Sequence, residues 1–187
     1  MKLLRGIALV AISCWLGIAL TAQDATAPSA SAAAGKAESG TTSKTRVVSP
    51  AELEKDFFSL LRAGDEKKFL AYVSEGGMNV GREPEHLSRS EVEDQITHHT
   101  GLYCKLFDSS CLPSEIRLDQ SNVRACSYRE LLTQSKDVRT AATEATRNGV
   151  KQAILVARVK NDNCAGVGLV DFIFNLQSDG WKLFSVP

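Results

Sequence analysis

The chain has 187 residues, of which 43% are apolar and 24% are charged, and its 22 basic side chains balance its 22 acidic ones. This length allows one domain with a tail, and the composition excludes a chain that is disordered throughout. The balanced charge argues against a dedicated binder of nucleic acid or of anionic membranes, because either needs a clustered excess of basic side chains. Composition alone identifies no reaction.

The N-terminus is typical of a secretory signal peptide. Two basic residues precede an uncharged, mainly apolar run over 6–20, and small residues follow it. We expect cleavage after Ala22, which makes 1–22 the signal peptide, or after Ala19. The run is short for a membrane span, which needs about 20 residues. An uncleaved anchor is the alternative, and it would be the chain's one attachment to a membrane.

Residues 23–49 are rich in Ala, Ser, Thr and Gly and contain no Leu, Ile or aromatic residue. Such a segment buries too little apolar surface to offset the entropy lost on ordering it. We therefore predict a disordered linker that spaces a domain from a membrane or envelope. A tail without a role is the alternative.

The remaining residues, 50–187, form the predicted folded domain, which is long enough to bury a sizeable core without a metal. Its first part has the spacing of helices. Ser49, Pro50 and Glu52 make a capping box with proline at the first helical position. Apolar residues then recur on one face as far as Leu61, which predicts an amphipathic helix.

Two more helices are expected. Gly64 ends the first helix, and Asp65 can cap the second. Ser88 and Glu91 form a second capping box that opens a third helix, which stops near Gly101.

The last part of the chain predicts an antiparallel sheet. Residues with β-branched and aromatic side chains are concentrated in three segments separated by turn residues, Ala153–Val159, Val167–Leu176 and Trp181–Val186. An earlier strand is predicted over Asn122–Leu132, and a short extended piece over Met78–Val80. Residues 134–149 fit either a helix or a long extended arm. Helices followed by a curved antiparallel sheet define an α+β fold, here cone-like.

This layout resembles the nuclear-transport-factor-two-like (cystatin-like) superfamily of α+β cones. Three segments carry the resemblance, Arg62–Asp65 between two helices, Leu87–Glu91 at the opening of the third, and Asp179–Leu183 at the closing strands. The resemblance covers most of 50–187 and rests on layout more than on motifs. It implies a pocket or a dimer module and is compatible with isomerases, dehydratases and many non-enzymes, so the fold implies little about activity.

Four cysteines remain after removal of the signal peptide, namely Cys104, Cys111, Cys126 and Cys164. An even number in an exported chain favours disulfides, and four cysteines allow three pairings. We favour Cys104 with Cys111, closing a short loop, and Cys126 with Cys164, joining two parts of the sheet region. A zinc site is the rival, although the spacings lack paired C-x-x-C units. Buried free thiols are the other alternative.

Asp171 is the candidate catalytic residue. In the strand predicted over Val167–Leu176, alternation places Phe172 and Phe174 on one face and leaves Asp171 among apolar neighbours on the other. Desolvation there would raise the pKa of the carboxyl group, which suits a general base or a group that orients a substrate. An ion pair with Arg158 and simple exposure to solvent are the alternatives.

Four aromatic residues are candidates for lining a ligand pocket: Tyr103, Phe107, Tyr128 and Trp181. Packing in the core is the alternative for all four, because aromatic side chains in a small domain usually serve there.

The histidines carry a weaker indication of a site. Asp94 and His98 share a helix face, which is compatible with metal ligation or an acid–base pair. His99 points about 100° away from His98, so the two cannot chelate together from a regular helix. A favourable interaction with the helix dipole is the alternative. His86 lies in a polar segment, and we predict neither a metal nor a cofactor.

Three functions fit these features. The first is an exported, non-catalytic domain that binds a small apolar ligand or a protein partner, and a homodimer through the sheet is expected by analogy. The second is a small lyase, isomerase or hydrolase with a cone pocket that uses Asp171. The third is an envelope structural protein in which the linker over 23–49 performs most of the role. Either a periplasmic or a secreted location fits the signal peptide and the cysteines.

Overall fold

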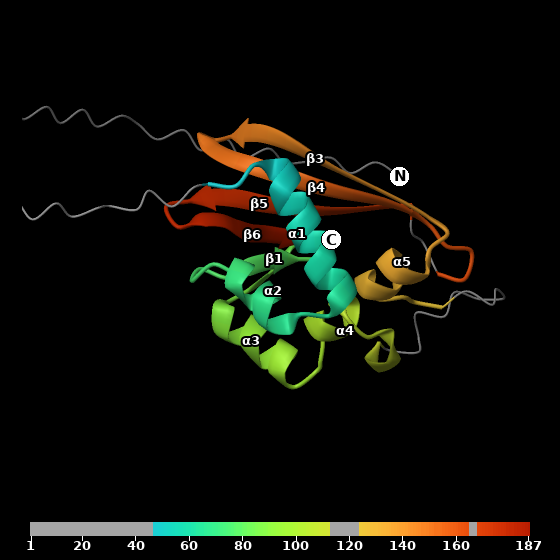
Figure 1. The fold of residues 1–187 in the computed structure, drawn as a ribbon. Coiled ribbons are helices and arrows are strands. Elements are labelled where there is room, and N and C mark those ends of the chain that lie inside the picture. The colour runs from blue at the N-terminus through green and yellow to red at the C-terminus, as the bar shows by residue number, and fades with distance from the viewer. Residues whose placement is uncertain (1–46, 113–123, 165–167) are drawn as a thin grey trace, which may run out of the picture. The chain divides into compact units, whose positions relative to one another are not determined.

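The computed structural model describes residues 47–112, 124–164 and 168–187 (Figure 1). The predicted signal peptide and most of the predicted linker lie outside the described residues. The three residues just before the first helix, Val47 to Ser49, are described.

The described residues form helices first and a large sheet afterwards. The helical elements are α1 (Pro50–Ala63), α2 (Glu66–Tyr72), α3 (Arg89–Thr97), α4 (Leu102–Leu106), the 3-10 turn η1 (Ser109–Cys111) and α5 (Tyr128–Gln134). The strands are β1 (Met78–Val80), β2 (Glu85–Leu87), β3 (Asp137–Arg147), β4 (Val150–Lys160), β5 (Leu169–Gln177) and β6 (Gly180–Val186). This order confirms the α+β class.

The capping signals act where the sequence places them. The Ser49 side chain accepts a hydrogen bond from the backbone N–H of Glu52, whose carboxylate accepts one from the N–H of Ser49, and this closes the capping box of α1. Gly64 ends α1 in a left-handed conformation, with φ of 70°, which costs a glycine little. Asp65 then caps α2 through the backbone N–H of Lys68, at 3.0 Å.

The sheet has six strands in the order β2-β1-β6-β5-β4-β3. Its ladders are antiparallel except one, because β1 pairs parallel with β6, with Asn79 opposite Ser185. The wholly antiparallel sheet predicted from the sequence is therefore corrected to a mixed sheet. Met78–Val80 and β6 lie far apart along the chain, so local periodicity could not reveal that the two segments pair.

The sequence of residues 134–149 fits either a helix or an extended arm. In the structure most of this segment is extended and forms β3. It pairs with β4 over eleven consecutive residues, from Asp137 opposite Lys160 to Arg147 opposite Val150. Asn148 and Gly149 join the two strands, with φ of 51° and 77°. Positive φ at both central residues matches the right-handed twist of a two-residue hairpin.

The strand predicted over Asn122–Leu132 is wrong where the chain enters α5. Ser127 is fully buried and caps this helix, because its side chain accepts from the N–H of Glu130 while the Glu130 carboxylate accepts from the N–H of Ser127. Within the described residues, the only strand-like pairing of Arg124 is an isolated bridge to Cys164. The apolar pair Leu131–Leu132 therefore faces the core from a helix.

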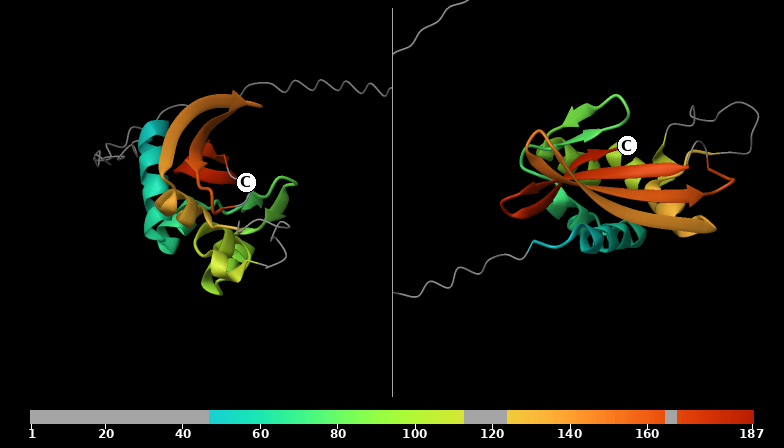
Figure 2. Two further views of the ribbon diagram at one scale, coloured as in Figure 1. Left: turned by 90° about the vertical axis from the view of Figure 1, so that its right-hand side faces the viewer. Right: turned by 90° about the horizontal axis from the view of Figure 1, so that it is seen from above.

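The core lies between α1 and the sheet, and it is aromatic. The ring of Phe57 on α1 packs edge-on against Phe172 and Phe174 of β5, with ring centroids 5.0 Å and 4.9 Å apart. This confirms the alternation of β5, because both phenylalanines are fully buried. Figures 1 and 2 show α1 lying across one face of the twisted sheet, with α3 and α4 on the side of the β1–β2 hairpin.

The interior behind these rings is filled. A void of about 10 Å³, lined by side chains that include Tyr128, Leu131 and Phe172, is the space found between α5 and the sheet. That is room for about one water molecule. None of the helices in the described ranges is long and apolar enough to cross a membrane.

Candidate functional site

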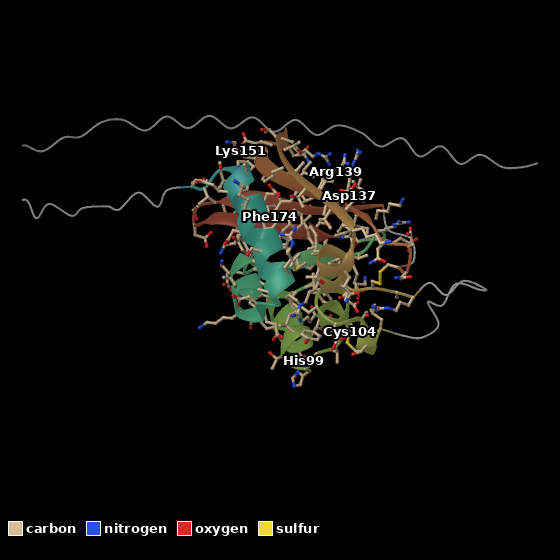
Figure 3. All side chains as sticks on the ribbon, turned by 45° about the vertical axis from the view of Figure 1, so that its right-hand side comes forward. His99, Cys104, Asp137, Arg139, Lys151 and Phe174 are labelled. Atoms are coloured by element: carbon tan, nitrogen blue, oxygen red, sulfur yellow. A yellow bond between two sulfur atoms is a disulfide. The ribbon has the colours of Figure 1, made fainter. Side chains whose placement is uncertain are left out.

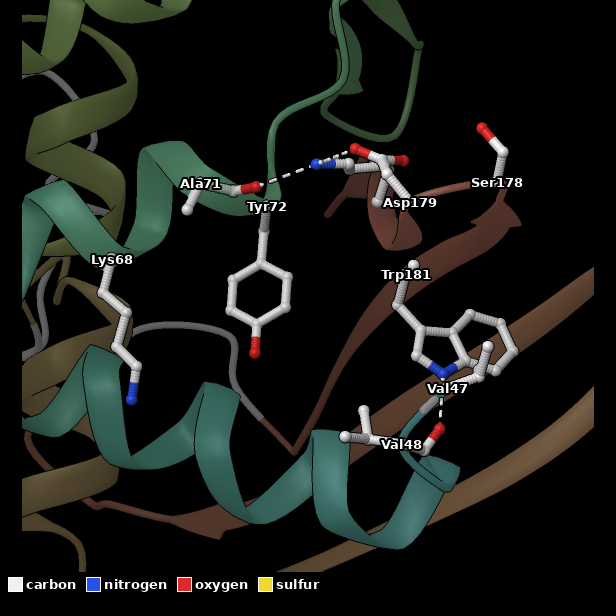
Figure 4. A pocket seen from close by; sticks show the side chains of 10 residues that line it. Val47, Val48, Lys68, Ala71, Tyr72, Ser178, Asp179 and Trp181 are labelled. Atoms are coloured by element: carbon white, nitrogen blue, oxygen red, sulfur yellow. Dashed lines mark hydrogen bonds and ion pairs between the residues drawn. The ribbon is translucent and has the colours of Figure 1, made fainter. Parts of the chain in front are cut away.

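A groove of about 320 Å³ opens on the surface between α2, the turn that joins β5 to β6, and the segment before α1 (Figure 4). Tyr72, Trp181 and the two valines Val47 and Val48 supply its apolar lining, and polar and charged side chains stand at its rim. We call it the Tyr72–Trp181 groove.

Trp181 connects two distant parts of the chain. It is the second residue of β6 and follows the turn Ser178–Asp179, and Gly180 adopts a φ of 122° that suits glycine. The indole N–H donates to the backbone oxygen of Val48 at 2.9 Å, which holds the approach to α1 against the groove. The indole is 5% exposed, so this polar atom has its partner where water is largely excluded.

Tyr72 stands on the other side of the groove with its hydroxyl group engaged. The hydroxyl donates to one carboxylate oxygen of Asp56 at 2.6 Å, and the Lys68 ammonium donates to the other, also at 2.6 Å. The hydrogen bonds from Lys68 and then Tyr72 lower the pKa of Asp56, while burial and the hydrogen bond to Asp56 raise that of Tyr72. Tyr72 therefore remains a neutral donor.

The opposite rim is neutralised as well. The Lys182 ammonium donates to the backbone oxygen of Ala71 at 3.2 Å and pairs with the Asp179 carboxylate at 2.9 Å (Figure 4). The hydrogen bond from Lys182 lowers the pKa of Asp179. With both lysines paired, the groove presents mainly aromatic and aliphatic surface, which favours apolar ligands over ions.

Of the four predicted ligand-binding aromatics, the described structure brings only Tyr103 and Phe107 into ring contact, with ring centroids 5.6 Å apart. Trp181 lines the groove. Phe107 is a core residue at 3% exposed, packed against Phe69, and Tyr103 stacks on His99 with ring centroids 4.1 Å apart. Tyr128 packs edge-on against the core residue Phe172, with ring centroids 5.4 Å apart, and lines the small interior void.

The Tyr128 hydroxyl donates to the backbone oxygen of Pro187 at 2.6 Å. Burial, followed by the nearby Asp171 charge, raises the pKa of this tyrosine to about 12. The hydroxyl is thus a fixed donor that ties α5 to the residue after β6.

Asp171 is exposed on the face of β5 that points away from α1, opposite Val156 of β4. The predicted face is confirmed, and the alternative of exposure to solvent describes the side chain. The suggested ion pair with Arg158 is not found within the described part of the chain. Asp171 is also not among the residues that line the Tyr72–Trp181 groove.

The histidines make exposed pairwise contacts. The Nδ1 atom of His98 lies 3.1 Å from the Asp94 carboxylate, and the Nε2 atom of His99 lies 3.7 Å from that of Glu66. His86 is 3.4 Å from Asn79. Across the ranges that the structure describes, His, Cys, Asp and Glu form no group of three or more that could hold a metal.

Both disulfides have the pairing that the sequence favoured. Cys104 and Cys111 close a loop between α4 and η1, and Cys126 and Cys164 join the segment before α5 to the loop after β4. Two disulfides in a domain of this size fit an oxidising compartment outside the cytoplasm.

Sequence reasoning found Trp181 and missed the rest of the groove. Tyr72 lies at the end of α2, and its contact with Asp56 spans 16 residues, so no local pattern reveals this contact. Val47 and Val48 carried a signal, because they are the apolar residues nearest the domain in a segment of small and polar residues.

Comparisons with known proteins assign no family to this chain. No protein-family model matches the chain, and no curated protein matches its sequence. Two solved structures are similar, both designed nuclear-transport-factor-two-like proteins. Rd1NTF2_05, in a variant with five substitutions, has a TM-score of 0.39 and 11% identity over 72% of this chain and 91% of its own. Rd1NTF2_04 with long sheet has a TM-score of 0.38 and 10% identity over 74% and 97%.

Proposed function

We propose that this chain is an exported, non-catalytic binding module that takes a small apolar ligand in the Tyr72–Trp181 groove. The observation that carries the proposal is the groove itself, about 320 Å³ lined by two aromatic rings and two valines, with its rim lysines already paired. Sites for small ligands are concave and mostly apolar, with a few polar groups that fix orientation.

The compartment in this proposal rests on two features. The predicted signal peptide over 1–22 directs the chain out of the cytoplasm. The two disulfides agree with a periplasmic or secreted location, where such bonds persist.

The enzyme alternative, a small lyase, isomerase or hydrolase that uses Asp171, has less support. The carboxylate is exposed on the face away from α1, and the space behind Phe172 is filled. The third function, an envelope structural protein, depends on the linker over 23–49, of which 23–46 lie outside the described residues.

A titration of the full chain with toluene tests the binding proposal. In a Trp15→Phe chain Trp181 is the single tryptophan, and its emission should change saturably as toluene enters the groove. Val48→Ser should weaken the response several-fold, because the side chain of Val48, 41% exposed, lines the groove. At 100 times the dissociation constant, toluene should stabilise the fold by about 2.7 kcal/mol.

Val150→Ser is the matched control. This valine is similarly exposed, at 39%, but lies at the β3–β4 turn outside the groove. A response without saturation, or an equal loss in both serine variants, would show that toluene binds elsewhere and would refute the proposal.

We also propose that two copies pair through the sheet face opposite α1. Phe184 is 41% exposed there, and Ile154 and Ile173 lie side by side and half-buried in neighbouring strands. The buried Oε1 atom of Gln152 on this face has no donor in the described structure. Sedimentation velocity should show a dimer, and Phe184→Glu should dissociate it. Lys55→Glu is the control, because Lys55 is exposed on α1 at the other side of the sheet, and it should leave the dimer intact. A monomeric wild type at high concentration rules out this pairing.

A further inference from the structure

The β3–β4 ladder places two arginines side by side. Arg139 lies directly opposite Arg158, so both point to the sheet face away from α1. The next pair on that face is Asp137 opposite Lys160. Like charges directly opposite each other in a sheet destabilise it. These two pairs hold three cations and one carboxylate, and Asp171 of β5 is the diagonal neighbour of Arg158 on the same face.

Neighbouring carboxylates neutralise only part of the positive charge of Arg139, Arg158 and Lys160. The Arg139 guanidinium contacts Asp137 at 3.3 Å. On its other side Arg158 has Leu169 of β5 as its neighbour, an apolar side chain that is 58% exposed. Considering 47–112, 124–164 and 168–187 alone, we find no carboxylate within ion-pair distance of Arg158 or Lys160.

The surface is hollowed at this position. One depression of about 240 Å³ is lined by Asp137, Arg139, Arg158 and Lys160 together with one valine. Lys160 also lines a second depression of about 350 Å³, together with Lys136, the carboxylate of Asp162 and three amide side chains. Figure 3 shows Asp137 and Arg139 toward one end of the sheet and Lys151 toward the other. At that other end Lys151 is paired with Glu144 at 2.9 Å.

We propose that Arg139, Arg158 and Lys160 form a cationic cradle for an oxyanion group, and that a second, linked oxyanion of the same ligand reaches Lys136. The ligand class is a soluble diphosphate or a comparable pair of linked phosphate or sulfate groups. A planar guanidinium matches two oxygens of such a group, and an anion between two arginines replaces their repulsion with attraction.

Calorimetric titration of the full chain with pyrophosphate at low ionic strength tests the cradle, with orthophosphate in parallel. We expect saturable binding of pyrophosphate that is at least fivefold tighter than that of orthophosphate. Arg158→Gln should weaken pyrophosphate binding at least tenfold, because it removes a charged guanidinium group that can donate two parallel hydrogen bonds. Arg147→Gln, at the other end of the same hairpin, is the control and should leave the affinity within twofold.

Thermal unfolding of the same proteins gives a second readout. Without pyrophosphate Arg158→Gln should unfold at a temperature equal to or above that of the wild type, because it relieves the repulsion from Arg139. With pyrophosphate the order should reverse. Equal losses of affinity in the Arg158 and Arg147 variants, no saturable binding, or an unchanged order of unfolding would each overturn the proposal. Equal affinity for the two anions would overturn the part assigned to Lys136.

Discussion

Trp181 and Tyr72 show how single polar atoms shape the groove. Each ring carries one polar atom, and each atom is satisfied by a group from α1 or the segment before it, namely Val48 and Asp56. The rings are therefore held in place before any ligand arrives. A site that is already ordered loses less side-chain entropy on binding.

The Glu130 carboxylate predicts a specific loss of stability in acid. Burial alone would raise its pKa, but hydrogen bonds from Ser109, Arg124 and the backbone of Ser127 outweigh burial and lower it to about 2. An ordinary glutamate titrates near 4.5. The stabilisation is therefore complete above about pH 4.5 and is lost as the pH falls toward 2. Because the group is partly exposed, we expect a loss of about 1–2 kcal/mol.

Urea unfolding of the wild type and Glu130→Gln at pH 6, 4 and 3 measures this effect. The difference in unfolding free energy between them should be largest at pH 6 and shrink in acid. A constant difference would contradict the lowered pKa.

At the scale of single elements, two glycines with positive φ differ in their surroundings. A Cβ at Gly77, φ 83°, would collide with the backbone oxygen of Leu87, whereas a Cβ at Gly149, φ 77°, meets nothing within 4 Å. Gly77→Ala should therefore cost about 3 kcal/mol or more, because the backbone of the β1–β2 region must move. Gly149→Ala should cost about 1 kcal/mol, from the left-handed conformation alone.

The comparison is made by urea unfolding of the two variants. Similar costs would show that conformation, and not the close approach of Leu87, decides the glycine at 77. Circular dichroism before unfolding confirms that each variant keeps its helices.

The elements predicted from the sequence were those with local signals. Capping boxes located α1 and α3, and alternation located β5 and the face of Asp171. The sequence also contains local signals for α5, where a strand was predicted, and for β3, where the prediction allowed a helix or an extended arm. Ser127 with Glu130 repeats the pattern of the other capping boxes, and Asn148–Gly149 is a strong hairpin turn.

The missed features are the ones that depend on contacts far apart in the sequence. The parallel pairing of β1 with β6 spans more than 100 residues, and the hydrogen bond from Trp181 to Val48 spans 133. The exposure of Asp171 depends on the outer face staying uncovered by a helix. Local periodicity carries no information on such contacts, so most of the fold and little of the groove could be predicted.

For the whole molecule, the two disulfides should differ in their effect. Cys126–Cys164 spans 38 residues and Cys104–Cys111 spans 7. Closing the longer loop removes more entropy from the unfolded chain, which gives about 4 kcal/mol against about 2 kcal/mol for the shorter loop. Replacing each pair with serines and measuring urea unfolding checks this. A larger loss for the Cys104–Cys111 pair would show that strain or local packing outweighs loop length.

The place of β6 inside the sheet sets the order in which this domain can be assembled. The strand lies between β1 and β5, so the early and late parts of the chain share a ladder only through residues 180–186. While a ribosome or a translocation channel still holds those residues, β1 lacks its inner neighbour and Val48 lacks its indole partner. Until residues 180–186 are released, the sheet therefore cannot close between β1 and β5, and that part of the polypeptide stays extended enough to pass through a narrow pore.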